Sequence, residues 1–323
     1  MNHVITNPIS NIPVNEKSHV HGWTQVWRDQ LNASINHKCT PAILKADTVF
    51  IDHGANFGGT LNLFGGASKE VYDKINLVAA CKDVVSLDWD MPDFGAMLKK
   101  RIGAASTYEG ITEEWCDMVS KRFANTVSLK QEELCYGSVT LGDSHSIAFS
   151  DIGHRVLRND GKTLFGALRS GLDDLLRASV PSETIHLCFG SIDIRHHILR
   201  HDDNLEYLIG QYTDQGKGLE DKYGVKVKYA FPVPVEFEGR RIPKSGFFKG
   251  TAFYGSWQDR YDLTERFKDR LHYYSDGSVI APPQEWYTMD PEKYAKTFME
   301  HGSSFHIAPP FYLRNNWGQT CLA

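Results

Sequence analysis

Short apolar runs alternate with helix-like segments along much of this chain, and this alternation constrains the fold more than any other feature. In the second half, runs typical of strands buried on both faces of a parallel sheet occupy residues 136–141, 184–189, 225–231 and 278–281. Helix-like segments occupy residues 172–178, 204–222 and 258–273. Strands that alternate with helices in this way predict an α/β fold with a parallel sheet.

The first half shows the same alternation in a shorter form. Strand-like runs occupy residues 47–51 and 83–87, and helix-like segments occupy residues 69–80, 94–102 and 113–123. The first 45 residues are rich in Asn, Pro, Ser and His and should be irregular, and a polar stretch at residues 125–133 suggests a boundary. We therefore expect an irregular segment over residues 1–45, a smaller α/β domain over residues 46–133, and a larger α/β domain over residues 134–323.

Composition limits the partners and the compartment. The chain has 323 residues, 41% hydrophobic and 23% charged, with a formal net charge of −5, which is ordinary for a soluble protein and favours neither nucleic acid nor an anionic membrane. No secretory signal is recognisable, and no apolar run approaches the ~18 residues that a membrane span needs. The six cysteines form no Cys-x-x-Cys pair, so we expect free thiols in a reducing compartment and therefore a cytoplasmic location. We expect neither a metal nor an organic cofactor.

A turn directly after the strand at residues 136–141 carries the main functional signal. Its Gly-Asp-Ser sequence ends at Ser144, and a serine in a tight turn after a strand is how α/β hydrolases expose a nucleophile. A serine hydroxyl needs a neighbouring base to attack at neutral pH. His306 is the candidate base, because a segment near the end of the chain can fold back over the sheet edge. Asp143 and His145, on either side of the serine, are expected to contact or orient substrate.

Four short segments between residues 134 and 316 resemble, in the right order, the sequence blocks of the SGNH (GDSL-like) hydrolases and acyltransferases. They are Gly142-Asp143-Ser144, Ser170-Gly171, Phe189-Gly190-Ser191-Ile192-Asp193, and Ser303-Ser304-Phe305-His306. The resemblance implies a three-layer, flavodoxin-like parallel sheet. It also implies that Ser144 is the nucleophile, that His306 is the base, and that the amides of Ser144 and Gly171 form the oxyanion hole.

The third block departs from the family pattern. Ile192 stands where the family has an asparagine that donates to the oxyanion. We expect Arg195 to add positive charge there and Asp193 to fix the surrounding loop. Ser191 and His196, in the same segment, are expected to contact substrate.

The fourth block departs as well, because Ser303 stands where the family has the aspartate of its catalytic triad. Ser303 is expected to hold the imidazole of His306 and to lie near substrate, with Asp290 as the alternative orienting group. Loss of a triad carboxylate can cost ~10⁴ in turnover. A slow hydrolase, a transferase or an inactive relative is therefore expected rather than a fast esterase.

Two other patterns support different functions. A glycine-rich segment at residues 54–66 follows a predicted strand and precedes a predicted helix, where a loop could cradle a phosphate, although it matches neither the dinucleotide nor the P-loop motif. His197 and His201 lie four residues apart, which suits two metal ligands on one helix face, but no third ligand is evident in the sequence.

These residues together predict a serine-nucleophile ester hydrolase or acyl transferase that acts on a small-molecule or carbohydrate ester. The alternatives are a two-domain glycosyltransferase that uses a nucleotide-sugar, and a binding protein that keeps the fold without catalysis. The sequence does not assign an oligomeric state.

The missing acid leads to a gain-of-function prediction. Ser303→Asp would place a carboxylate beside His306, and a nearby anion raises the pKa of a histidine and makes it a stronger base. We expect turnover of a small activated ester to rise about tenfold, whereas Ser303→Ala should not raise it. Unchanged turnover in both variants, with His306→Ala inactive, would show that residue 303 does not orient the base.

Overall fold

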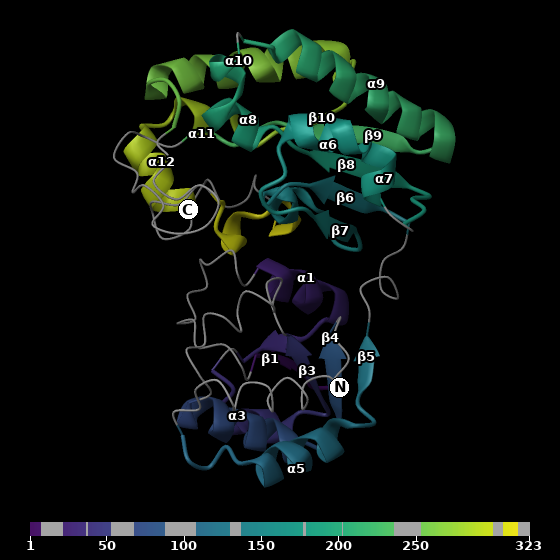
Figure 1. The fold of residues 1–323 in the computed structure, drawn as a ribbon, viewed down its shortest axis with the longest axis vertical. Coiled ribbons are helices and arrows are strands. Elements are labelled where there is room, and N and C mark those ends of the chain that lie inside the picture. The colour runs from purple at the N-terminus through teal and green to yellow at the C-terminus, as the bar shows by residue number, and fades with distance from the viewer. Residues whose placement is uncertain are drawn as a thin grey trace. The chain divides into compact units, whose positions relative to one another are not determined.

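The computed structural model of the chain describes residues 1–7, 22–36, 38–52, 68–87, 108–129, 137–176, 179–201, 203–235, 253–299 and 306–315. Its strands form two parallel sheets of five strands each (Figure 1). The chain divides into two compact units, Met1–Leu134 and Cys135–Ala323, and no strand in the described ranges belongs to both sheets. The fold is therefore α/β, as the alternation of apolar runs and helices predicted.

The sheet of the second unit has the strand order β10-β9-β8-β6-β7, and its neighbouring strands are parallel. The strands are β6 (Val139–Gly142), β7 (Arg155–Arg158), β8 (Thr184–Cys188), β9 (Lys226–Ala230) and β10 (Val279–Ile280). Counted within the unit, this is the flavodoxin-like order 2-1-3-4-5. The chain passes from one side of β6 to the other between β7 and β8. The carboxyl ends of β6 and β8 therefore flank the switch point at which such sheets bind ligands.

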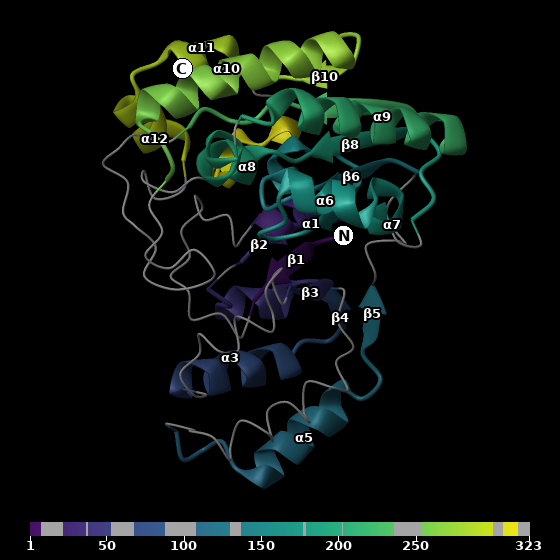
Figure 2. The same ribbon diagram turned by 45° about the horizontal axis from the view of Figure 1, so that its top comes forward.

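Three helices cover one face of this sheet, namely α6 (Leu164–Ser170), α7 (Leu172–Leu176) and α9 (Leu205–Tyr223). Their apolar side chains share a core with Leu141 of β6 and Leu187 of β8. The long helix α10 (Trp257–Tyr274) packs beside α9, as both views show (Figures 1 and 2). This layer is the main hydrophobic core of the unit.

A short 3-10 helix, η4 (Ser146–Phe149), covers the opposite face. His186 of β8 points away from the core side because successive strand residues alternate between faces, and its Nδ1 atom donates to the carbonyl of Phe149 at 3.0 Å. η4 also contacts η8 (Leu313–Asn315). The other elements of the unit are α8 (Ser191–His196), η5 (Ile198–Arg200), α11 (Gln284–Thr288), α12 (Pro291–Phe298) and η7 (Pro309–Phe311).

The sheet of the first unit has the order β2-β1-β3-β4-β5 and is again parallel. Its strands are β1 (His3–Thr6), β2 (Ser34–Ile35), β3 (Thr48–Asp52), β4 (Val84–Leu87) and β5 (Val127–Leu129). The helices α3 (Lys69–Ala79) and α5 (Glu113–Phe123) share a core with Ile51 of β3. On the other face Trp27 of α1 (Gly22–Leu31) packs with Ile5 of β1. The two units therefore have the same strand order.

The expectation that residues 1–45 are irregular was wrong. These residues contain β1, α1, β2 and the 3-10 helix η2 (Pro41–Lys45), and β1 is an interior strand between β2 and β3. Ile5 is fully buried. A four-residue strand among Asn and Pro residues shows too little periodicity to be recognised, and its pairing with β3 is what makes it a strand.

Other local expectations had mixed outcomes. The helix expected at residues 113–123 is confirmed by α5, where the Thr112 side chain accepts from the amide of Trp115 and so caps the first turn. β5 lies inside the stretch expected to be a boundary, and β7 and α6 were not predicted. The helix expected at residues 94–102 and the glycine-rich segment at residues 54–66 lie outside the described residues.

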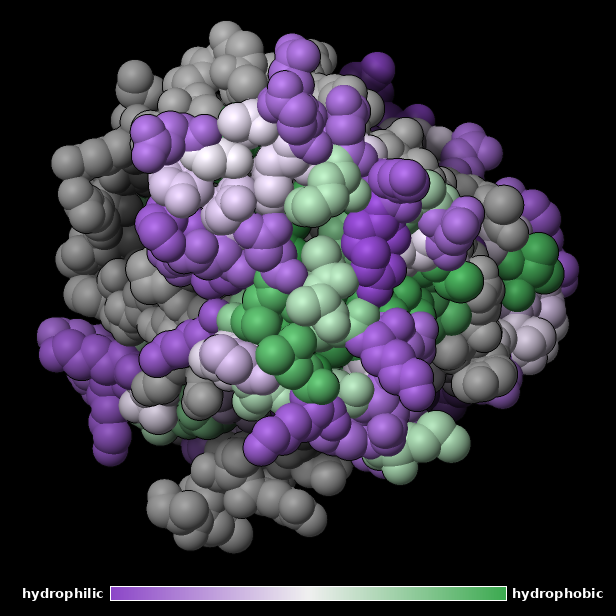
Figure 3. Space-filling view, turned by 90° about the horizontal axis from the view of Figure 1, so that it is seen from below, coloured by the Kyte–Doolittle hydropathy of each residue, from purple (hydrophilic) through white to green (hydrophobic). Residues whose placement is uncertain are grey.

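The face shown in Figure 3 is mostly polar where the structure describes it. Seen from below Figure 1, hydrophilic side chains surround one interrupted group of hydrophobic ones (Figure 3). Some large apolar side chains of the first unit are exposed, Met118 and Val127 among them, as is usual on protein surfaces. None of the described helices is long and apolar enough to cross a membrane.

Substitution of two glycines of α9 by alanine would test how closely this helix packs on the sheet. A methyl group at Gly216 would overlap the phenol ring of Tyr229 on β9, with 2.7 Å to its Cζ atom, whereas a methyl group at Gly210 would meet no atom within 4 Å. Gly216→Ala should therefore lower the free energy of unfolding by about 1–3 kcal/mol. Gly210→Ala should raise it by about 0.5–1 kcal/mol, because alanine loses less backbone entropy in a helix. Urea unfolding compares the two variants, and effects of equal sign and size would contradict this packing.

Candidate active site

The candidate nucleophile lies in a turn at the carboxyl edge of the second sheet. Ser144 follows β6 and is half-buried. The strands β6 and β8 approach so closely at this edge that a methyl group at Gly142 would lie 2.6 Å from the Cβ atom of Cys188. These two residues are register partners, so the turn starts level with the end of β8. Ser144 therefore lies at the switch point of the sheet.

The structure brings His306 to Ser144, although the two residues are 162 positions apart in the chain. The Nε2 atom of His306 lies 2.8 Å from the Oγ atom of Ser144, which is the reach that a general base needs. The amide of Ala308 donates to the carbonyl of Phe298 at 2.9 Å and so ties this segment to the end of α12. When the serine hydroxyl donates to Nε2, the hydrogen of a neutral imidazole resides on Nδ1.

Both carboxylate oxygens of Asp143 accept hydrogen bonds that stabilise the turn. Oδ1 accepts from the amide of His145 at 2.8 Å and lies 3.1 Å from the Nδ1 atom of the same histidine. Oδ2 accepts from the hydroxyl of Ser191 at 2.9 Å, and this hydroxyl lies 3.0 Å from His145 Nδ1. All three side chains are buried. They form a polar cluster next to Ser144 and His306, with the rings of His145 and His306 5.1 Å apart.

The backbone amides of the turn differ in whether they donate a hydrogen bond. The amide of Asp143 donates to the carbonyl of Cys188 at 3.0 Å, and the amide of Ser146 donates to the carbonyl of Asp143 at 3.1 Å. The amide of His145 donates to the Asp143 carboxylate. Within the part of the chain that the structure describes, the Ser144 amide makes no hydrogen bond. It is therefore free to receive a developing oxyanion.

Gly171 does not provide the second oxyanion donor that we expected. It follows α6 with a φ of 85°, and its amide donates to the carbonyl of Leu168 at 3.2 Å, because it ends that helix. The loop after β7 reaches the site instead, since the amide of Asn159 donates to the carbonyl of Gly142 at 2.8 Å. Gly161 follows in this loop with a φ of 73°. The turn sequence Asn-Asp-Gly was the available signal, but β7 had not been recognised in front of it.

Asp193 fastens α8 to α6. Its carboxylate accepts from the amides of Leu164 and Phe165 at 2.6 and 3.3 Å, which are orphan donors at the start of α6. The side chain is fully buried, and burial raises its pKa to about 6, although the two amide bonds act in the opposite direction. This placement directs the carboxylate of Asp193 to backbone amides of α6.

The other predicted residues of α8 are buried. The Nη1 atom of Arg195 donates to the carbonyl of Ser191 at 2.7 Å, so its positive charge lies beside the segment that binds Asp143. The His196 ring lies 5.2 Å from the ring of Phe253. Ile192, which stands in the family's asparagine position, is 9% exposed.

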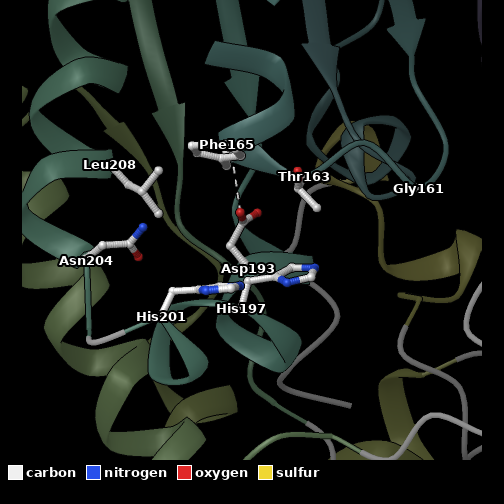
Figure 4. Close-up of a pocket in the computed structure, with 8 residues that line it drawn as sticks. All are labelled: Gly161, Thr163, Phe165, Asp193, His197, His201, Asn204 and Leu208. Carbon is white, nitrogen blue, oxygen red and sulfur yellow. Dashed lines mark hydrogen bonds between the residues drawn. The ribbon is translucent and has the colours of Figure 1, made fainter. Parts of the chain in front are cut away.

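A cavity of about 560 Å³ opens beside α8 (Figure 4). Phe165 and Leu208 give it apolar surface, and His197, His201 and Asn204 give it polar groups. The two imidazole rings are stacked with their centres 6.2 Å apart. Burial lowers the pKa of His197, which disfavours the charged form of this ring.

Two walls of this cavity come from segments that form hydrogen bonds with the turn that carries Ser144. Gly161 belongs to the loop that bonds to Gly142, and Asp193 belongs to α8, whose Ser191 bonds to Asp143. The cavity therefore adjoins the structure that holds Ser144, and its volume falls in the range of small-molecule sites.

The group that orients His306 was expected to be Ser303 or Asp290. Ser303 lies outside the described residues. Asp290 is exposed and caps α12, where its Oδ1 atom accepts from the amide of Lys293 at 2.9 Å. Asp290 makes no bond to His306 in the described part of the chain, so the alternative that it replaces the triad acid was wrong.

Comparison with known proteins adds a distant likeness. No family model matches the chain, and no curated protein matches it. Among solved structures, an acetyl xylan esterase is similar over 45% of this chain and 76% of its own, with 15% identity and a TM-score of 0.30. A likeness at this level transfers no function, so a functional assignment depends on the residues of the site.

The raised pKa of Asp193 should make the free energy of unfolding depend on pH. Its pKa is about 6 in the folded chain and near 4 for an exposed carboxyl, so the folded state holds this proton more tightly. The resulting stabilisation is complete below about pH 4 and is lost as the pH rises through about 6, on the order of 3 kcal/mol. Asp193→Asn cannot ionise, and its free energy of unfolding in urea should vary less over this range.

Asp221→Asn is the matched control for this measurement, because Asp221 is an exposed carboxyl on α9. The control should keep the pH dependence of the wild type. A stability difference between wild type and Asp193→Asn that stays constant across the range would contradict the raised pKa.

Proposed function

We propose that this protein is an ester hydrolase or acyl transferase with Ser144 as its nucleophile and His306 as its base. The 2.8 Å distance between Ser144 Oγ and His306 Nε2 is the observation that supports the proposal. At this distance a proton can pass directly from the hydroxyl to the imidazole, which is how a serine is activated. The position of Ser144 at the switch point of a parallel sheet adds support, because ligands bind there.

The proposed reaction has two steps. Ser144 Oγ attacks the ester carbonyl carbon while His306 Nε2 takes the hydroxyl proton, and the imidazolium then gives this proton to the departing alcohol. An acyl group remains on Ser144. His306 next takes a proton from water or from an acceptor alcohol, whose oxygen attacks the acyl carbon. The bond between the acyl carbon and Ser144 Oγ breaks, and the imidazolium returns the proton to Ser144 Oγ. Water gives hydrolysis, and an alcohol gives transfer.

We assign the oxyanion to backbone amides. The amide of Ser144 has no other acceptor in the described residues, and we place the amide of Gly161, in the loop bonded to Gly142, as the second donor. One donor of this kind is typically worth ~10²–10³ in rate. Two amides would compensate for the isoleucine at residue 192.

Asp143, His145 and Ser191 are positioning residues in this proposal. Their mutual bonds and their burial leave the turn little freedom, so Ser144 Oγ stays aligned with His306. Preorganisation of this kind lowers the entropy cost of reaching the transition state.

We propose small-molecule or carbohydrate esters as the substrate class. The cavity beside α8 combines the aromatic ring of Phe165 with the imidazole of His197, whose charged form is disfavoured by burial, and the amide of Asn204. Such a lining suits a neutral molecule that carries hydroxyl groups, because each polar group can hydrogen-bond without a charged partner. The carbohydrate would then be the part of the ester outside the acyl group.

Ser144→Ala should reduce hydrolysis of a small activated ester by at least about 10³-fold and abolish labelling by a fluorophosphonate. The melting temperature should barely change, because Ser144 is only half-buried and its hydroxyl supports no other described contact than His306. Ser170→Ala is the matched control, since Ser170 bonds to Lys162 and Gly166 away from the pair.

Full turnover in Ser144→Ala would reject the proposed nucleophile. An equal loss in Ser170→Ala would show that the effect is structural. Thermal stabilisation by a nucleotide-sugar, without any ester turnover by the wild type, would favour the glycosyltransferase alternative.

A further inference from the structure

Polar side chains gather on the face of the second sheet that lies opposite α9. Thr140 of β6 and His186 of β8 are register partners, so their side chains are neighbours on one face. His154, directly before β7, reaches the same place, because its Nδ1 atom lies 2.9 Å from the Thr140 hydroxyl. These residues take no part in the proposed ester chemistry.

Three groups that can bind a metal meet at this place. One ligand atom from each of Asp151, His154 and His186 lies within 4.8 Å of the other two, and the two imidazole rings have their centres 4.4 Å apart. Both histidines are buried, and Asp151 is exposed. Zinc–ligand bonds of about 2.0–2.1 Å require a slightly tighter cluster, which the exposed Asp151 side chain can close by rotation.

Both imidazoles are oriented by hydrogen bonds at Nδ1. His186 donates from Nδ1 to the carbonyl of Phe149 at 3.0 Å, and His154 bonds through Nδ1 to the Thr140 hydroxyl. Within the described residues, neither ring has a hydrogen bond at Nε2. A histidine that donates one ring nitrogen to a backbone carbonyl presents a free lone pair on the other, as metal-binding histidines usually do.

We propose that Asp151, His154 and His186 form a binding site for one divalent cation of the zinc class. Two imidazoles select zinc, copper or nickel over magnesium and calcium, which prefer oxygen ligands. The exposed side of the cluster leaves a fourth position for water. The ion would tie the loop before β7 to β8 and would act on structure, since the site shares no residue with Ser144 and His306.

Because positive charges surround the cluster, its affinity for a cation should depend on Asp151. Arg314, which donates to the hydroxyl of Ser150, and Lys228 of β9 both act electrostatically on His154. Their positive charges oppose a bound cation. Asp151 supplies the one negative charge in the ligand set, so affinity should depend strongly on this carboxylate.

From the sequence we expected no metal site, and we considered only the helical pair His197 and His201. The proposed ligands come from a loop and a strand that the sheet pairing brings together, so their spacing follows no local motif. The two histidine pairs must therefore be separated experimentally.

Zinc titration of the full chain tests the proposal, with protein prepared without a histidine tag and freed of metal by a chelator. We expect calorimetry to show one zinc ion per chain at this site and the melting temperature to rise with zinc. Asp151→Asn should weaken binding about tenfold or more and leave the zinc-free melting temperature unchanged, because Asp151 is exposed. His154→Gln should weaken binding at least as much.

Two controls remove comparable groups elsewhere. Asp221→Asn on α9 and His272→Gln on α10 change exposed residues and should bind zinc as the wild type does. Lack of zinc binding by the wild type, or an unchanged Kd in Asp151→Asn, would overturn the proposal. Loss of binding in His201→Gln with normal binding in Asp151→Asn would place the ion at the other pair and would also overturn it. Asp151→Asn keeps the test decisive even if His154→Gln does not fold.

Discussion

The geometry of the turn at the carboxyl edge of the second sheet depends on the carboxylate of Asp143. Asp143 is 1% exposed, and a buried carboxylate is costly unless hydrogen bonds replace its lost water. Here an amide, a hydroxyl and an imidazole surround it, while the backbone of the same residue bonds to Cys188 and Ser146. Asp143 thus connects β6, β8, α8 and η4. Any relaxation of the turn would leave buried polar groups without partners, so Ser144 is held in place.

The pairing of β6 with β8 places both of the sites that we describe. At the carboxyl end, the close approach of Gly142 to Cys188 sets the turn of Ser144 level with the end of β8. Two residues earlier, the pair Thr140 and His186 presents polar side chains on the face covered by η4. A strand directs alternate residues to opposite faces. One ladder can therefore support a hydrophobic core on one side, a polar cluster on the other, and the turn that carries Ser144 at its end.

The two units have the same strand order, but their switch points carry different residues. In the first unit β1 ends at Thr6 and β3 ends at Asp52, and both side chains are buried. In the second unit the corresponding edge carries Ser144 and Ser191. The same topology thus presents different residues at the edge of the sheet, and function depends on such residues rather than on the fold.

The sequence by itself determined the α/β class and the strands β3, β4, β6, β8, β9 and β10, because each is an apolar run bounded by turn residues and long enough to recognise. It also determined that Ser144 stands in a turn after a strand, and it singled out His306. It could not show β1 or β7, because only the two central residues of each are apolar, and both become strands only by pairing with β3 and β6. Because β7 is not recognisable in the sequence, the sequence did not point to the loop after it, whose Asn159 amide donates to the carbonyl of Gly142. Only the tertiary structure decided the 2.8 Å contact of Ser144 with His306, the burial of Asp193 and the meeting of His154 with His186. The physical reason is that these contacts join residues far apart in the chain. Their distances are set by the pairing of the strands and by the bond of Ala308 to Phe298, which no local pattern encodes.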